Sequence, residues 1–359
     1  MENKGRFFQS DDERVGIQMS SLRLVGISLL ASLALFPLQA AAWDRGEVET
    51  FATLPAGSAN PEGITADKQG NIYVTTFNPT APAGTLGRLI VFNRDGQLVR
   101  DVPVQGSSPA LLGLDFHPIT GALLIIDFGA GKVLKVNPVN GHSDVFTTVT
   151  GSSGLNALTF DSQGNVYISD SFQGIIWRTG QNGAPVATAW VTDKDTLTTP
   201  GVPGFGANGV GFNKAETILY VANTGNDTVV QIPVSGGVAG KPSVLTNSIN
   251  GADGLILDDD DNIWVAANQA DEIVVIDKTG KVIAKLGDFD GIDGHGSPIG
   301  LLFPASPVFS GEWLYVTNLS LDLRKVGGPQ TVDSQWADQV KAQTIARLRA
   351  RIPHIRGDD

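Results

Sequence analysis

The stretch that decides the fold is residues 251–266, which read GADGLILDDDDNIWVA. It opens with a small-residue turn, continues into an apolar run at 255–257, passes through an acidic turn and ends in a second apolar run at 263–266. Short apolar runs bounded by Gly and Asp are typical of β-strands. The stretch therefore predicts two strands joined by a tight turn.

The same phrase recurs along the chain, each time with a small residue at the same place. These small residues are Gly63, Gly113, Ala157, Gly209, Gly254 and Gly300, which lie 44 to 52 residues apart. A repeat of this size with several short strands per unit is typical of a β-propeller, in which each unit forms one blade. Third strands and glycine-containing turns follow in each unit. The predicted fold class is all-β, a six-bladed β-propeller.

The sixth copy of the repeat lacks a fourth strand, because Val326 runs directly into Gly327, Gly328 and Pro329. We expect residues 48–54, which precede the first blade, to supply this outer strand by pairing with residues 323–326. Such an N-terminal strand would close the last blade and remove an exposed sheet edge.

The N-terminus has the pattern of an export signal. Arg23 precedes an apolar run at 24–36, and the alanines at 40–42 offer a cleavage site before Trp43. Residues 1–18 are a polar leader, so Met19 is an alternative initiator. The apolar run is short for a membrane span, although an uncleaved anchor stays an alternative. We predict a signal peptide at 1–42, periplasmic or secreted localisation, and no stable membrane insertion after cleavage.

The C-terminus, residues 329–359, follows a propeller predicted over 43–328. A set of apolar residues falls there on helical spacing, and Pro353 stops the pattern. This spacing predicts a C-terminal amphipathic helix that packs on the ring with its arginines in solvent. A membrane-surface helix is the alternative. The apolar residues are Trp336, Val340, Ile345, Leu348 and Ile352.

Charge and composition exclude several functions. The net charge of −12 argues against nucleic acid as a partner, since phosphates require a basic face. The chain has no cysteine, so disulfide and thiolate chemistry are excluded. It also lacks a serine nucleophile elbow, a phosphate loop and a dinucleotide fingerprint. We expect a monomer whose partner is a small molecule.

Oxygen donors stand just before the small residue in four of the six repeats: Glu62, Asn156, Asn208 and Asp253, against Leu112 and Ile299 in the others. Because equivalent positions in a propeller converge near the axis, these donors should meet at one mouth of the central channel. Buried carboxylates without a cationic partner would be costly. A bound cation removes that cost, and hard oxygen ligands suit Ca²⁺, with another divalent cation possible. The alternative is that Asn and Asp only cap turns.

These turns also resemble a known family. Glu62 in a Pro-Glu-Gly turn, Asn156 and Asn208 in the third and fourth repeats, and Asp253 in an Ala-Asp-Gly turn look like the calcium site of the senescence marker protein (regucalcin) and gluconolactonase family. The site is also similar to that of diisopropyl fluorophosphatase and, more distantly, the paraoxonases. The resemblance implies a calcium-dependent six-bladed hydrolase in which Asp253 is both metal ligand and base or nucleophile.

A substrate pocket is predicted at the same mouth. Inserts at 78–87 and 192–206 could form a lid, and His295 enters the sixth repeat at this end and could shuttle a proton. Ordinary loop packing and a solvent-exposed histidine are the alternatives. The acidic run 258–261 is either a solvated turn or a second metal site. Apolar walls could come from four phenylalanines: Phe77, Phe128, Phe172 and Phe205.

The predicted function is an exported Ca²⁺-dependent hydrolase of a lactone or ester, similar to gluconolactonase. Two other classes stay open. One is a non-catalytic propeller of the NHL type that binds a ligand or a protein, and the other is a lyase propeller without this metal set.

Overall fold

The computed structural model describes residues 44–201 and 204–353. The signal peptide predicted at 1–42, with its alternative start at Met19, lies outside the described residues. Within the described ranges, no helix is both long and apolar enough to cross a membrane.

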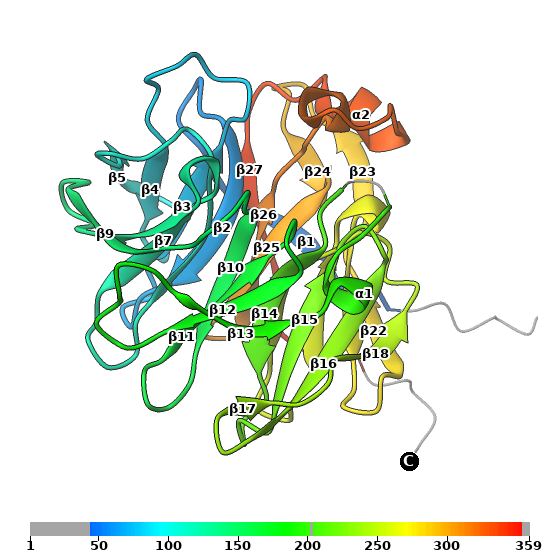
Figure 1. The fold of residues 1–359 in the computed structure, drawn as a ribbon. Coiled ribbons are helices and arrows are strands. Elements are labelled where there is room, and N and C mark those ends of the chain that lie inside the picture. Colours follow the sequence, from blue (N-terminus) through cyan, green and yellow to red (C-terminus); the bar gives the residue numbers. More distant parts are fainter. Residues whose placement is uncertain (1–43, 202–203, 354–359) are drawn as a thin grey trace, which may run out of the picture. The chain divides into compact units, whose positions relative to one another are not determined.

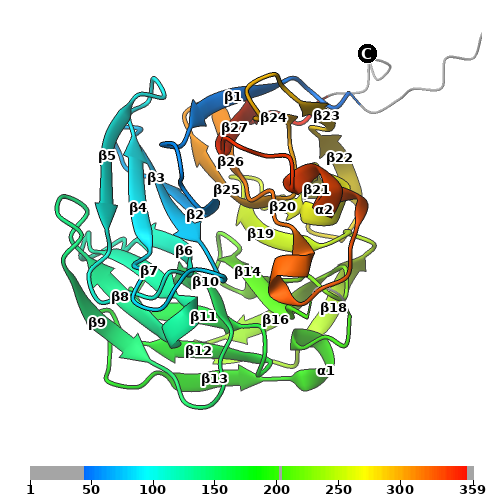
Figure 2. The same cartoon turned by 90° about the horizontal axis from the view of Figure 1, so that it is seen from above.

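Six four-stranded antiparallel units surround one axis in the described part of the chain (Figures 1 and 2). Each unit is a blade, and its strands run outward in chain order, except that the outermost strand of blade six is β1. Blade one has β2 (Asn60–Ala66), β3 (Ile72–Phe77), β4 (Arg88–Phe92) and β5 (Leu98–Pro103); blade two has β6 (Leu111–Phe116), β7 (Leu123–Asp127), β8 (Lys132–Val136) and β9 (Ser143–Thr148); blade three has β10 (Leu155–Phe160), β11 (Val166–Asp170), β12 (Ile175–Thr179) and β13 (Thr188–Thr192).

The remaining three blades follow the same plan. Blade four adds a short strand β17 that pairs only with the end of β16. Blade four has β14 (Ala207–Phe212), β15 (Ile218–Asn223), β16 (Thr228–Ser235), β17 (Val238–Ala239) and β18 (Ser243–Asn247); blade five has β19 (Ala252–Leu257), β20 (Ile263–Ala267), β21 (Glu272–Ile276) and β22 (Val282–Leu286); blade six has β25 (Pro304–Ser310), β26 (Trp313–Asn318), β27 (Thr344–Arg349) and β1 (Val48–Thr53). The predicted fold class is confirmed.

The second strand of each blade carries the core. In β3, β7, β11 and β20 every residue is buried. Neighbouring blades cover both faces of these strands, so the strands are mostly apolar and do not alternate between apolar and polar residues. This packing explains why the repeat is so clear in the sequence.

Every innermost strand has a β-bulge, and in the first five blades this bulge includes the small residue of the repeat. In blade one, Pro61 pairs with Thr76 and the next pair is Ile64 with Val74, so Glu62 and Gly63 together oppose one residue. Two residues opposite one is the definition of a bulge, which re-aims the side chains at that point. The same skip occurs in the other five inner strands.

The sixth bulge corrects one prediction. It lies at Ala305 and Ser306 of β25, between the pairs Pro304–Asn318 and Pro307–Val316. Ile299 instead belongs to a separate hairpin of β23 (Phe289–Ile292) and β24 (Pro298–Gly300), and it is 44% exposed. The Gly-Leu sequence at the end of that hairpin resembles the repeat. The actual inner strand, β25, contains two prolines and so does not match the repeat pattern.

Closure of the ring is confirmed, with a different partner strand. β1 pairs with β27, and β27 pairs with β26, which gives blade six its fourth strand. Residues 323–326, the predicted partner, form the 3₁₀ helix η3 (Leu323–Val326) instead. Closure therefore joins segments from the two ends of the described chain.

A small C-terminal helix is present at α2 (Val332–Ala337), but the predicted amphipathic helix through 352 is wrong. Residues 344–349 are a strand because blade six has an open position that buries Ile345 and Leu348. The arginines are not simply solvated: Arg347 and Arg349 lie over the Trp313 ring, with their guanidinium carbons 4.3 and 4.0 Å from its centroid. The ring thus extends beyond residue 328.

The acidic run 258–261 lies in a turn that has counterparts in other blades. Asp258 accepts hydrogen bonds from the backbone and side-chain nitrogens of Asn262 and from Trp264 Nε1. Asp67 in blade one accepts equivalent bonds from Asn71 and Tyr73. Both oxygens of Asp258 are therefore used to fix the turn, which favours the turn over a second metal site.

Candidate functional site

The four predicted oxygen donors meet in one cavity on the ring axis. Glu62, Asn156, Asn208 and Asp253 all line it and are only 4–5% exposed. Each comes from the bulge of an inner strand, in β2, β10, β14 and β19 respectively. The cavity has about 40 Å³ open to water, enough for a few water-sized groups. The other lining residues are Phe77, Leu112, Phe205, Thr224, Asn268, Phe303, Leu319, Leu321 and Leu323.

The residue after each donor is small, a glycine in three cases and Ala157 in the fourth, because the next blade approaches closely. A Cβ on Gly209 would lie 2.5 Å from the Leu255 nitrogen, and one on Gly254 would lie 2.6 Å from the Ala305 oxygen. Real Cβ atoms do not approach backbone so closely. The small residue of the repeat therefore lets neighbouring inner strands pack tightly enough to bring their donors together.

Hydroxyl groups of the second strands fix the bulges. Thr75 Oγ1 accepts from the Gly63 nitrogen at 3.0 Å and donates to the Leu112 oxygen at 2.6 Å. Thr317 Oγ1 likewise donates to the Glu62 oxygen at 2.6 Å, which links blade six to blade one. These bonds hold the backbone of the donors, so the side-chain positions are set by several blades at once.

Three acceptor oxygens of residues that line this cavity have no hydrogen-bond partner among the described residues. Asn268 Nδ2 donates to Asp253 Oδ2 at 2.8 Å, but Asp253 Oδ1 and Asn268 Oδ1 have no donor. Glu62 Oε2 is also buried and without a partner. Buried acceptors are normally satisfied, so three together indicate a missing positive group.

The pKa values of the two carboxylates also indicate a missing positive group. Burial, and then the negative charge of Asp253, raise the pKa of Glu62 well above its usual value. Burial raises the pKa of Asp253 to about 7, opposed by hydrogen bonds from Asn268 and Asn208. Among residues 44–201 and 204–353, no lysine, arginine or histidine lines the cavity. Two close carboxylates in such surroundings are stable as anions only beside a cation.

The donor set fits a hard divalent cation. Two carboxylates and the amide oxygens of Asn156, Asn208 and Asn268 are the ligand types that Ca²⁺ binds. Across the described residues, no group of three His, Cys, Asp or Glu side chains is placed to hold a metal, which disfavours a zinc or copper centre. The site is thus a mixed carboxylate–amide one.

Comparison with known proteins identifies the family. The model of the SMP-30/gluconolactonase/LRE-like region matches residues 152–287, which include Asn156, Asn208 and Asp253. Those residues are an SMP-30/gluconolactonase/LRE-like region. The resemblance inferred from the sequence is thereby confirmed, and no curated protein matches the chain in sequence.

Solved structures share the fold of this propeller at low identity. A calcium-binding regucalcin from Agrobacterium tumefaciens strain C58 is 16% identical, with a TM-score of 0.58 over 86% of this chain and 98% of that one. A gluconolactonase from Xanthomonas campestris is 13% identical, with a TM-score of 0.57 over 86% and 91%. Virginiamycin B lyase from Staphylococcus aureus is 15% identical, with a TM-score of 0.52 over 76% and 82%.

The predicted phenylalanines lie at the mouth of this cavity. Phe77 and Phe205 line the cavity, and their rings lie 6.0 Å from that of Phe128. Phe172 stacks on Phe205 with ring centroids 5.7 Å apart. The four residues therefore form one contiguous cluster, in which Phe77 and Phe205 line the cavity and Phe128 and Phe172 lie outside it.

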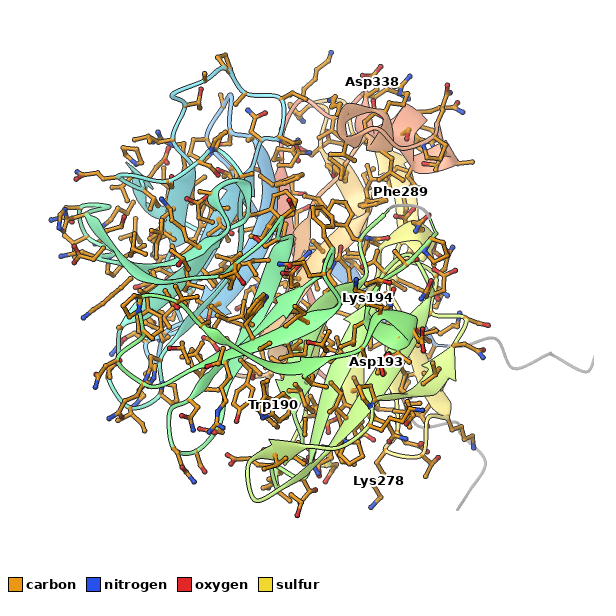
Figure 3. All side chains as sticks on the ribbon, in the orientation of Figure 1. Trp190, Asp193, Lys194, Lys278, Phe289 and Asp338 are labelled. Atoms are coloured by element: carbon orange, nitrogen blue, oxygen red, sulfur yellow. The ribbon has the colours of Figure 1, made fainter. Side chains whose placement is uncertain are left out.

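His295 is not brought into the site. Its side chain is 93% exposed, in the turn between β23 and β24, near Asp293. The insert at 78–87 does begin at the mouth, directly after Phe77. The described part of the insert at 192–206 contains α1 (Lys194–Leu197), which Asp193 caps through the nitrogens of Asp195 and Thr196 (Figure 3).

Sequence reasoning missed Asn268 and Thr224. Both come immediately after the second strand of their blades, and the equivalent residues Phe77 and Leu319 also line the cavity. Thr224 Oγ1 accepts from Asn208 Nδ2 at 3.0 Å and donates to the Ala252 oxygen at 2.8 Å. Comparing the residues at the end of each second strand across the repeats would have found them.

The chain after β26 covers the cavity. Leu319, Leu321 and Leu323 line it and are at most 5% exposed. Asn60 Nδ2 holds this segment by donating to the Leu319 and Ser320 oxygens at 2.6 and 3.2 Å. Figure 2 shows the segment, in orange, passing over the ring toward α2. We call residues 319–323 the strap.

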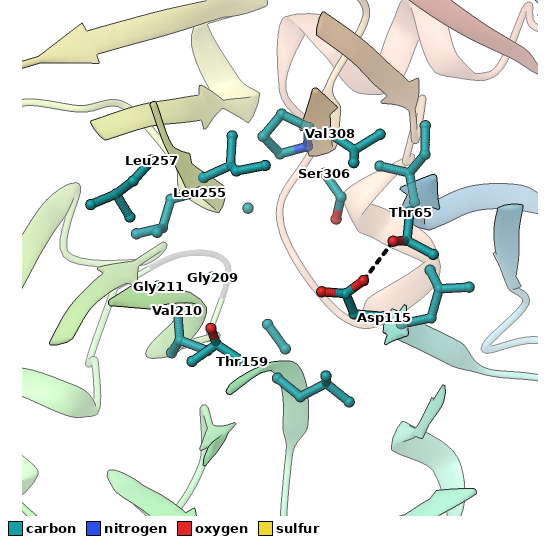
Figure 4. A pocket seen from close by; sticks show the side chains of 18 of the residues that line it. Thr65, Asp115, Thr159, Gly209, Val210, Gly211, Leu255, Leu257, Ser306 and Val308 are labelled. Atoms are coloured by element: carbon teal, nitrogen blue, oxygen red, sulfur yellow. Dashed lines mark hydrogen bonds between the residues drawn. The ribbon is translucent and has the colours of Figure 1, made fainter. Parts of the chain in front are cut away.

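A second cavity of about 310 Å³ lies further along the axis, between the far halves of the inner strands (Figure 4). One ionisable side chain lines it, Asp115, whose Oδ1 accepts from Thr65 Oγ1 at 2.7 Å. Burial raises the pKa of Asp115. A single carboxylate already bound to a hydroxyl does not make a convergent site, so the candidate active site is the smaller cavity.

Proposed function

We propose that this protein is an exported hydrolase of lactones or related esters that depends on Ca²⁺ or another divalent cation. The observation that carries the proposal is a set of three buried acceptor oxygens without a partner, on residues that line one cavity: Glu62 Oε2, Asp253 Oδ1 and Asn268 Oδ1. The family match and the likeness to a gluconolactonase support the reaction class.

The roles of the residues follow from their chemistry. Glu62, Asn156, Asn208, Asp253 and Asn268 would hold the ion. When bound, the ion would polarise the carbonyl of the substrate as a Lewis acid. Asp253 would deliver the attacking oxygen, either by taking a proton from water or by direct attack on the carbonyl carbon.

Position decides between the two carboxylates. Asn268 fixes one oxygen of Asp253 and leaves Oδ1 free in the cavity. Thr317, by contrast, fixes the backbone of Glu62, and no described residue bonds to Glu62 Oε2. Asp253 is therefore the better oriented group, and Glu62 serves mainly to hold charge.

Export and a monomeric state complete the proposal. The basic, apolar and small-residue segments before Trp43 support export to the periplasm or the medium. The closed ring, whose N-terminal strand covers the edge of blade six, supports a monomer.

Two other classes are distinguished by specific observations. In virginiamycin B lyase, a variant with one histidine replaced by alanine is catalytically inactive. No histidine lines the present cavity, which disfavours a lyase of that kind, although His354 lies outside the described residues. A binding propeller of the NHL type would need no carboxylate with a free oxygen inside the ring.

The test is a screen of the purified mature protein against lactones, aryl esters and phosphotriesters, with calcium and with a chelator. Turnover that disappears on chelation and returns with calcium is the expected result. Ligand binding without turnover would favour the binding module. Turnover unaffected by chelation would overturn the metal dependence.

A further inference from the structure

We propose that the substrate of this site carries an apolar chain or ring, which lies on the cluster of Phe77, Phe128, Phe172 and Phe205, and that polyhydroxylated lactones are poor substrates. This inference rests on the proposed hydrolase function and specifies its substrate class.

The cluster is a continuous row of contacting rings that runs from the cavity to solvent. Phe77 is 4% exposed and lines the cavity, whereas Phe172 is 47% exposed. Phe128 joins them, with ring centroids 6.0 Å from Phe77 and 5.8 Å from Phe172. Phe205, which also lines the cavity, stacks against Phe172. A substrate whose reacting carbonyl entered the cavity would leave its remaining atoms on these rings.

Phe172 is held in place although it is half exposed. Its ring packs on Gly154, where an added Cβ would lie 2.7 Å from the Phe172 Cγ. The backbone nitrogen of Phe172 donates to Asp170 Oδ1 at 3.1 Å, and the same oxygen accepts from the Gly154 nitrogen at 2.9 Å. An exposed aromatic ring that is fixed on three sides is preorganised to receive an apolar group.

Polar groups of the cavity are confined to its floor. The lining contains five donor side chains with ligand oxygens, together with Thr224, whose hydroxyl is already bonded on both sides. All the other lining residues are apolar: Phe77, Leu112, Phe205, Phe303, Leu319, Leu321 and Leu323. A sugar-like lactone would place several hydroxyls against these walls without partners, which is unfavourable.

The size of the cavity limits what enters it. About 40 Å³ accommodates an ion with one small reacting group, not a whole substrate. The body of the substrate must therefore lie outside, between the strap and the phenylalanine cluster. Specificity is then set by the apolar surface at the mouth rather than by the ion-binding floor.

Three lactones with the same six-membered ring test this. δ-Valerolactone has no substituent, δ-decanolactone has a five-carbon tail, and glucono-δ-lactone has hydroxyls. With calcium present, we expect kcat/KM for δ-decanolactone to exceed that for δ-valerolactone by about tenfold or more, because burying a few methylene groups is worth that much. We expect glucono-δ-lactone to be the poorest of the three. A preference for glucono-δ-lactone would overturn the inference.

Two variants locate the effect. Phe172→Ala removes the outer ring. Gly154→Ala keeps the Phe172 ring but pushes it from its present position. Both should reduce kcat/KM for δ-decanolactone about tenfold more than for δ-valerolactone. The control is Phe309→Ala, because Phe309 is also partly exposed and also contacts an aromatic ring, that of Trp264 at 5.4 Å. Phe309 lies near the end of β25 that is away from the bulge and does not line the cavity. An equal loss of both rates in all three variants would contradict the proposal.

A binding measurement separates this inference from the proposed function. Calorimetry with the calcium-loaded Asp253→Asn variant measures the affinity for each lactone without relying on turnover. Tighter binding of δ-decanolactone than of glucono-δ-lactone, reduced by Phe172→Ala, supports the apolar subsite even if no lactone is hydrolysed. Hydrolysis of lactones without this order of affinities would retain the function and reject the subsite.

Discussion

Asn268 Nδ2 donates a hydrogen bond of 2.8 Å to Asp253 Oδ2, and this bond directs the other oxygen of Asp253 into the cavity without a partner. The two residues come from the inner and second positions of the same blade. Their pairing divides the carboxylate into an oxygen that is held and an oxygen that is free to bind an ion or a proton.

Asp253→Asn should retain calcium binding and lose most of kcat. The amide preserves a ligand oxygen of similar size but is neither a base nor a nucleophile. The measurement is kcat on a confirmed substrate at saturating calcium, beside Asn156→Ala and Asn208→Ala, which should mainly weaken calcium and substrate binding. A wild-type rate in Asp253→Asn would make Asp253 a ligand only.

Asn268→Ala should weaken calcium binding by about 10- to 100-fold, because it removes both a candidate ligand oxygen and the group that orients Asp253. Calcium titration by calorimetry measures this. Asn93→Ala is the control, since Asn93 is a turn residue whose side chain bonds only within residues 93–97. Equal affinities in the two variants would remove Asn268 from the site.

Calcium should raise the unfolding midpoint of the wild-type protein. A ligand that binds only the folded state stabilises it by about 2.7 kcal/mol at a hundredfold excess over its Kd. Glu62→Gln should reduce the shift, because it removes one negative charge from the donor set. Differential scanning calorimetry with calcium or chelator measures both effects. A midpoint that responds to neither would rule out the ion site.

Deletion of residues 43–55 should strongly destabilise the mature protein. It removes β1, exposes the edge of β27 and uncovers the space filled by Phe51 and Leu54, which are 9% and 4% exposed. Loss of two such side chains alone costs about 3 kcal/mol or more. Chemical denaturation gives the free energy of unfolding. Glu49→Ala is a comparison that breaks only the partly exposed ion pair with Arg347 and should cost less than about 1 kcal/mol.

Asp271 should make stability depend on pH. Burial raises its pKa to about 7, and its Oδ1 accepts from the Phe303 nitrogen at 2.7 Å. A carboxyl with a raised folded-state pKa binds more protons when folded than when unfolded. Its contribution to stability is therefore greatest below the usual Asp range and is lost as the pH rises from about 4 to about 7.

Asp271→Asn isolates this effect. It keeps an acceptor for Phe303, suits the left-handed backbone at this position (φ 53°) and removes the charge. The thermal midpoint of the variant should exceed that of the wild-type protein at pH 8 and approach it at pH 4, with a chelator present throughout. A constant difference between the two proteins across this range would contradict the assignment.

The sequence by itself determined the repeat, and the repeat determined most of the site. Second strands that are covered on both faces are mostly apolar. Inner strands that approach closely require a small residue after each donor. Both requirements recur in every blade, so they appear as a periodic pattern in the sequence. That pattern was enough to place Glu62, Asn156, Asn208 and Asp253 at equivalent positions. It was also enough to predict that the N-terminal strand closes the ring.

Tertiary structure decided what the repeat does not encode. Residues 344–349 have helical spacing, yet the open place in blade six makes them a strand, because pairing two exposed edges outweighs local propensity. Ile299 matches the repeat in sequence only, whereas strand pairing shows that Ala305 is the residue in the bulge of blade six. Asn268 and Thr224 reach the cavity only because all second strands end at the same mouth, and the strap covers it through contacts between residues distant in sequence. Local pattern records what each blade needs for its own packing; contacts between blades depend on geometry that no single repeat contains.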